Sequence, residues 1–173
     1  EDFMKLEGSR IIAADRETVW AALNDAEVLK ACINGCQELE KTSDTSFEAT
    51  VKQKVGPVSA TFKGAVELSD MNPPESYRIS GSGKGGAAGH ASGGADVKLA
   101  TVEGGTELTY NVDAKVGGKI AQLGSRIIDS FAKKMADTFF ERFQVGGAGM
   151  FGFNIAATEI ISQRGYDNYT ISQ

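Results

Sequence analysis

The sequence predicts an α+β fold in which a curved antiparallel sheet of about six or seven strands wraps around one long C-terminal helix. Apolar and polar residues alternate with period two through the middle of the chain, which is typical of an antiparallel sheet with one buried and one solvated face. Two short helical segments follow the first strand. An amphipathic segment of helical period follows the last strand, and its apolar side needs a concave partner.

The first predicted elements are a strand and two short helices. Residues 4–13 form the strand, and the carboxylate of Asp15 can accept hydrogen bonds from the free amides at the start of a helix. Asn24 with Glu27 offers a second helix start, for a turn or two over residues 26–31. We therefore expect two short helices between the first strand and the rest of the sheet.

The alternation is clearest in the strands that follow. Odd positions are apolar in residues 47–55, and even positions are apolar in residues 58–68. Glycine and proline residues mark the turns between successive strands. The strands predicted in this region cover residues 47–55, 58–68, 77–86, 91–102 and 108–115.

After residue 118 the apolar pattern changes to that of a helix of about seven turns. Charged and polar residues fill the opposite side of this helix. We expect residues 4–144 to form one domain and residues 145–173 to form a tail, to which the sequence assigns no structure. The apolar stripe consists of Ile120, Leu123, Ile127, Phe131, Met135 and Phe139.

Composition excludes several classes of function. The net charge of −5 argues against a nucleic-acid partner, which needs a basic face, and it leaves no polybasic mechanism for binding anionic lipid. Cys32, Cys36 and the distant His90 cannot make a four-ligand zinc site, so we expect reduced thiols and no metal. No signal peptide and no apolar run of the ~20 residues that span a bilayer are found, so a cytoplasmic protein is expected.

Residues 80–96 contain a cluster of seven glycines. Residues 81–86 match the dinucleotide pattern G-x-G-x-x-G, but the chain continues as a strand where that site needs a helix. Alternation extended from residue 79 instead turns every second glycine inward. These glycines either leave space for an apolar ligand beneath the helix or let the sheet bend sharply, and both interpretations remain open. The residues predicted to line the cavity are Trp20, Ile33, Phe62, Tyr77, Ile79, Gly81, Gly83, Gly85, Ala91, Gly93, Ala95, Leu108, Tyr110, Ile127, Phe131 and Met135.

No residue carries a clear catalytic signal. The only imidazole, His90, faces away from the predicted cavity by alternation, and the acidic residues lie on the solvated faces. No nucleophile stands beside a base within a recognisable motif. We therefore expect no catalytic residues and no enzymatic activity.

Four stretches of the chain resemble the CoxG family of carbon monoxide dehydrogenase subunits, and the resemblance covers about residues 4–144. That family belongs to the START-like, or polyketide cyclase and lipid-transport, superfamily with the helix-grip fold. Asn34 departs from the pattern, because the family usually has proline there. The stretches are Met4-Lys5-Leu6-Glu7-Gly8, Val19-Trp20-Ala21-Ala22-Leu23-Asn24-Asp25, Cys32-Ile33-Asn34-Gly35-Cys36-Gln37-Glu38-Leu39 and Gly83-Lys84-Gly85-Gly86-Ala87-Ala88-Gly89.

The resemblance implies an accessory protein of molybdenum-type carbon monoxide dehydrogenases or related hydroxylases. The implied roles are to hold a quinone or lipid near the dehydrogenase and to bring that enzyme to the membrane, on its inner face and transiently. Two alternatives remain open: a cyclase or hydratase on the same fold, and an adaptor that binds only proteins.

The tail offers a candidate membrane contact. Met150, Phe151 and Phe153 lie close together just past the predicted helix. Three such side chains, buried at a few kcal/mol each at most, would give weak and reversible attachment to lipid. The alternative is that they dock on the domain itself or on a neighbouring subunit.

Overall fold

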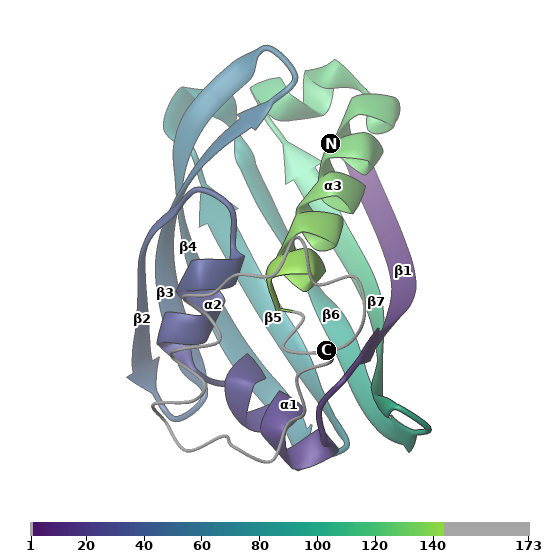
Figure 1. Cartoon of the computed structure of the whole chain (residues 1–173). Coiled ribbons are helices and arrows are strands. Elements are labelled where there is room, and N and C mark those ends of the chain that lie inside the picture. Colours follow the sequence, from purple (N-terminus) through teal and green to yellow (C-terminus); the bar gives the residue numbers. More distant parts are fainter. Residues whose placement is uncertain (1, 144–173) are drawn as a thin grey trace.

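A computed structural model of the chain describes residues 2–143. Within this range seven strands form one antiparallel sheet, in the order β1-β7-β6-β5-β4-β3-β2, which curves around helix α3 (Figure 1). The predicted fold class is confirmed. The strands are β1 (Asp2–Ile12), β2 (Cys36–Ser43), β3 (Ser46–Val55), β4 (Val58–Asn72), β5 (Ser76–Lys84), β6 (His90–Val102) and β7 (Gly105–Gly117). The helices are α1 (Arg16–Leu23), α2 (Ala26–Cys32) and α3 (Ser125–Phe143), with short 3-10 turns η1 (Gly86–Ala88) and η2 (Lys119–Leu123).

Consecutive strands pair with one another throughout the sheet, except that β1 pairs with β7. Helices α1 and α2 carry the chain from β1, at one edge of the sheet, to β2, at the other edge. They lie together near one end of the concave face, and α3 crosses the same face diagonally (Figure 1). This arrangement encloses the space between the sheet and the helices.

The two short helices begin at aspartates. The carboxylate of Asp15 accepts from the backbone amide of Thr18, as the sequence predicts for α1. The prediction for α2 is off by one residue, because Asp25 and not Asn24 caps it and accepts from the amides of Glu27 and Val28. An ionised carboxylate is a stronger acceptor for two amides than a neutral amide oxygen, which favours Asp25.

The long helix is shorter than the sequence predicts. Residues 119–123 form the separate turn η2, and Gly124 adopts a φ of +91° before α3 begins. This left-handed conformation suits glycine and interrupts the helical hydrogen bonds. Ile120 therefore belongs to a different element from the rest of the apolar stripe, although it is buried.

Strand β2 has no counterpart among the strands that the sequence predicts. It lies at the edge of the sheet, and most of its side chains are exposed. An edge strand without a buried face lacks the period-two signal on which the other strands were predicted.

The buried side chains form two clusters. The larger cluster joins α1, α2 and the end of α3 to the sheet and includes Val19, Val28, Cys32 and Phe143. The smaller cluster lies where β3, β7, η2 and the start of α3 meet, and its buried members are Val55, Val116, Ile120 and Ile128. The concave side of the sheet therefore has two separately packed ends.

Candidate functional site

An apolar cavity of about 340 Å³ lies between the sheet and the C-terminal half of α3. Every strand and all three α-helices contribute to its wall, so the cavity depends on the complete described fold. It belongs to the same region as the larger core cluster. The lining residues are Leu6, Leu23, Leu29, Ile33, Leu39, Phe47, Ala49, Val66, Leu68, Tyr77, Ile79, Ala95, Val97, Leu108, Tyr110, Val112, Ala136, Phe139 and Phe140.

The chemistry of this wall is almost uniform. None of its side chains is charged, and the only polar side-chain atoms among them are the hydroxyl oxygens of Tyr77 and Tyr110. Such a space favours an apolar molecule, because a polar group placed there would lose its hydrogen bonds to water.

Tyr77 stands at the end of the cavity near α1. Its ring meets the ring of Trp20 edge to face, with the ring centroids 5.1 Å apart. Burial raises the pKa of the Tyr77 hydroxyl well above its ordinary value. The hydroxyl therefore stays neutral at physiological pH and does not supply a charge to the cavity.

Tyr110 stands at the edge of the cavity near β1. Its ring stacks on Phe140 of α3, with centroids 5.3 Å apart, and it crosses Gly8, where an added Cβ would lie 2.5 Å from the Tyr110 hydroxyl oxygen. Only a residue without a side chain fits beneath this ring. Gly8 therefore sets the position of Tyr110 against α3.

Arg10 ties the same part of α3 to β1. Its guanidinium forms an ion pair with Asp137 and lies 5.3 Å from the centroid of the Phe140 ring. Partial burial lowers the pKa of Arg10, but hydrogen bonds to Asp137 and Tyr110 outweigh this effect, and the net pKa is raised. One side of the cavity is thus closed by a charged residue that touches three of its neighbours.

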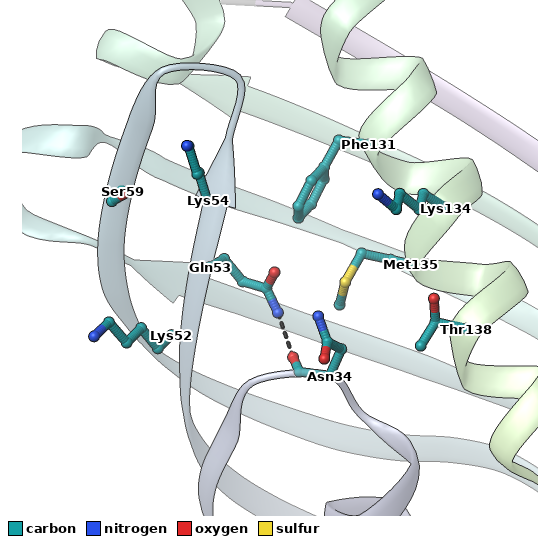
Figure 2. Close-up of a pocket in the computed structure, with 9 residues that line it drawn as sticks. All are labelled: Asn34, Lys52, Gln53, Lys54, Ser59, Phe131, Lys134, Met135 and Thr138. Atoms are coloured by element: carbon teal, nitrogen blue, oxygen red, sulfur yellow. Dashed lines mark hydrogen bonds between the residues drawn. The ribbon is translucent and has the colours of Figure 1, made fainter.

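A second, more polar hollow of about 320 Å³ opens between the β3–β4 hairpin and α3 (Figure 2). We call it the outer hollow. It adjoins the apolar cavity, since neighbouring residues of the 33–34 loop and of α3 line one or the other. Its lining residues are Asn34, Lys52, Gln53, Lys54, Ser59, Phe131, Lys134, Met135 and Thr138.

A polar bridge crosses the outer hollow on its inner side. The Gln53 amide donates a hydrogen bond of 2.5 Å to the backbone carbonyl of Asn34 (Figure 2). Arg142 in turn donates to the side-chain oxygen of Asn34 at 3.3 Å. Asn34, which departs from the family pattern, therefore holds the loop after α2 to both β3 and α3.

The structure brings six of the predicted lining residues together around the apolar cavity. Phe131 and Met135 instead line the outer hollow, and Trp20 backs the cavity through Tyr77. Phe62 packs with the smaller core cluster, and Ile127 is 37% exposed beside the turn at residue 56. The six that share the cavity are Ile33, Tyr77, Ile79, Ala95, Leu108 and Tyr110.

The glycines do not line this cavity. A Cβ at Gly93 would run into the backbone carbonyl of Asp113, and a Cβ at Gly85 would run into the ring of Phe62. At these positions glycine allows close approach of a neighbouring strand or ring. Gly81 faces Gly93 across the strand pair, and Gly83 faces Ala91 in the same way. The cavity predicted beneath the glycines is therefore displaced toward α1 and α2.

The residues that sequence reasoning missed are bulky and lie further along the same faces. Leu68, Val97 and Val112 have the inward parity that the alternation predicts, but they were not assigned to the cavity. Leu29 and Leu39 come from α2 and the unpredicted strand β2. Parity identifies the face of a strand but not the point along it where a cavity opens.

Three other features limit the chemistry of the described residues. Within residues 2–143, no group of three or more His, Cys, Asp or Glu side chains is arranged to hold a metal ion. His90 is exposed at the start of β6. None of the described helices is both long and apolar enough to cross a membrane. The predicted membrane contacts Met150, Phe151 and Phe153 lie outside the described residues.

A bent sheet, a long covering helix and an apolar cavity between them define a helix-grip domain of the kind that binds apolar ligands. The model of the carbon monoxide dehydrogenase subunit family CoxG matches residues 8–145, and the chain belongs to this family. The resemblance seen in the sequence is confirmed. None of the curated protein sequences matches the chain.

Several solved structures share the fold. A conserved protein from Geobacillus kaustophilus is 27% identical, with a TM-score of 0.76 over 92% of this chain and 96% of that one. The ZhuI aromatase/cyclase from Streptomyces sp. R1128 is 12% identical, with a TM-score of 0.59 over 94% of this chain and 96% of that one. Ara h 8.0201 is 11% identical, with a TM-score of 0.56 over 94% of this chain and 99% of that one.

Proposed function

We propose that this protein is a non-catalytic accessory subunit that holds an apolar ligand, a quinone or a lipid, in its cavity and links a carbon monoxide dehydrogenase-type molybdenum hydroxylase to the cytoplasmic face of the membrane. The observation that carries the proposal is the uncharged wall of the 340 Å³ cavity. Membership of the CoxG family supports the accessory role.

The size of the cavity restricts what it holds. A volume of about 340 Å³ is near the lower end of the ~300–1,000 Å³ of small-molecule sites. It suits a quinone ring or the first part of an acyl or isoprenoid chain. The rest of a longer ligand would extend past the Gln53–Asn34 bridge into the outer hollow.

The wall of the cavity also supports a binding role over a catalytic one. General acid–base catalysis needs a titratable group near the reacting atoms with a pKa close to the working pH. The titratable groups in the wall are two tyrosines, and burial moves the pKa of Tyr77 further from neutrality. This wall binds and shields a molecule without supplying an acid or a base.

Native mass spectrometry of the gently purified full chain, followed by organic extraction, tests the proposal directly. We expect an apolar molecule to co-purify and to be replaced by added quinone. Ala95→Leu, which fills the cavity from β6, should abolish this binding, whereas Ala100→Leu, on the exposed side of the same strand, should keep it. Equal binding by both variants would contradict the proposed site.

The membrane role is tested with the full chain on vesicles. Replacing Met150, Phe151 and Phe153 together by serine removes the apolar groups of the tail without shortening it. If the tail inserts in lipid, the serine variant should float less with vesicles than the parent. Equal flotation would remove these residues from the mechanism and leave the cavity proposal untouched.

A further inference from the structure

Three segments of the chain contain basic residues and no acidic ones. They are residues 50–66, 79–95 and 114–128. The first forms the β3–β4 hairpin, the second the β5–η1–β6 connection, and the third the β7–η2 connection to α3. All three connections meet at the end of the sheet away from α1 and α2, at the top of Figure 1, where η1 and η2 contact each other. We call this region the basic end.

The basic end carries much more positive charge than the rest of the molecule. Of the 18 basic and 23 acidic residues in the chain, these segments hold seven basic and none of the acidic ones. The remainder therefore carries 11 basic against 23 acidic residues. Asp2, paired with Val116 in the sheet, and Asp129, in α3, adjoin this end. The seven basic residues are Lys52, Lys54, Lys63, Lys84, Lys115, Lys119 and Arg126, and all seven are exposed.

The structure leaves part of this charge unbalanced. Lys63 and Lys84 lie directly opposite each other on β4 and β5, an arrangement that destabilises a sheet. In residues 2–143, neither of them forms an ion pair, and neither do Lys52 and Lys54. The ion pairs seen in that range use arginines elsewhere on the molecule. An anionic surface bound from outside would supply the missing countercharge.

We propose that the basic end is the surface by which this protein docks on a bilayer containing anionic lipid, an inference that rests on the proposed membrane role and gives it a location. The residue types favour lipid over an acidic protein. Six of the seven cations are lysines, which are depleted in protein interfaces, where arginine is enriched. Lysine stems can lie along apolar surface while the ammonium groups reach lipid phosphates.

Two exposed apolar side chains lie at the same end. Phe3 is 73% exposed, with the ammonium of Lys115 5.6 Å from its ring centroid, and Ile127 is 37% exposed beside Gly56. Single apolar groups interspersed with lysines are typical of surfaces that sit in the headgroup region of a bilayer. A stable protein interface would instead present a contiguous apolar centre.

The net charge of the chain misleads about this surface. Charges beyond about 8 Å are largely screened at physiological ionic strength, so the lipid interacts mainly with the end that faces it. The acidic remainder, repelled by the same lipid, orients the molecule with its basic end toward the bilayer. Lys52 and Lys54 also line the outer hollow, so the docked orientation places that hollow beside the headgroups.

Vesicle flotation of the full chain tests the proposal. The probes are phosphatidylcholine vesicles with and without phosphatidylglycerol, each at low and high salt. We expect binding only to the anionic vesicles and weaker binding at high salt. Each lysine near the surface contributes about fivefold in affinity, so K54Q/K63Q/K84Q should bind about a hundredfold more weakly than the parent. The control K30Q/K41Q/K98Q changes the net charge equally with exposed lysines outside the basic end, and it should bind like the parent.

Three outcomes would overturn the proposal: equal flotation of the two triple variants, no binding of the parent to anionic vesicles, or loss by K54Q/K63Q/K84Q only of capture of the dehydrogenase. The last outcome would make the basic end a protein-binding surface. Binding of an apolar fluorescent probe by each variant is measured in parallel. Loss of that binding with intact flotation would reject the cavity and leave the docking surface standing.

Discussion

The contact between Arg10 and Asp137 offers a sharp test of how the cavity is closed. Their side chains are 32% and 50% exposed, so solvent screens the pair and limits its contribution to about 0–1 kcal/mol. The cation–π contact of Arg10 with Phe140 adds about 0.5–1 kcal/mol. Arg10→Met, which keeps the apolar stem, should therefore lower the free energy of unfolding by about 1–1.5 kcal/mol, and Asp137→Asn by about 0.5 kcal/mol.

The same contact should control ligand exchange. If α3 must lift from β1 to release a molecule, a loss of about 0.5–1.5 kcal/mol accelerates release by roughly two- to tenfold. The measurement is stopped-flow release of a bound apolar fluorophore from both single variants and the double variant. Asp129→Asn, on the same helix and without an ion pair in residues 2–143, is the control. Unchanged release in Arg10→Met, or equal acceleration in Asp129→Asn, would refute this reasoning.

Three further changes test other parts of the structure. Burial raises the pKa of Cys32 to about 12, so the unfolded thiol ionises first and stability should fall by up to about 4 kcal/mol between pH 9 and 12; Cys32→Ala should flatten this fall in denaturant titrations. Gly93→Ala should cost about 2 kcal/mol or more in thermal unfolding, because its Cβ meets Asp113, while Gly83→Ala should change stability by less than about 1 kcal/mol. Gln53→Ala should remove the bridge across the outer hollow and speed probe release without abolishing binding.

Alternation of residue type was sufficient to predict most of the fold. It identified the inward face at Ile79, Leu108 and Tyr110, all of which line the cavity. It failed for β2, whose side chains face solvent at the sheet edge and therefore need not alternate. Local pattern reports burial, and an exposed edge strand is set by its neighbour instead.

The position of the cavity along the sheet could not be predicted, since it depends on where α3 crosses the strands. Gly124 delays the start of α3, and the cavity lies beneath Phe139 and Phe140 rather than beneath Phe131 and Met135. The sequence indicated an apolar stripe, but the crossing point is a property of the packed molecule. The glycine cluster suggested space, whereas close approach of neighbouring groups explains Gly85 and Gly93.

The pairing of β1 with β7 has a consequence for how the chain acquires its structure. Ile12 lies beside Thr106, so the first strand waits for most of the chain before its partner exists. Contacts of such long sequence separation slow folding, because the loop must close before the pairing is gained. During synthesis the apolar face of the sheet stays uncovered until α3 is made. A slow refolding phase and a need for chaperone protection at this stage are the expected signs of this topology.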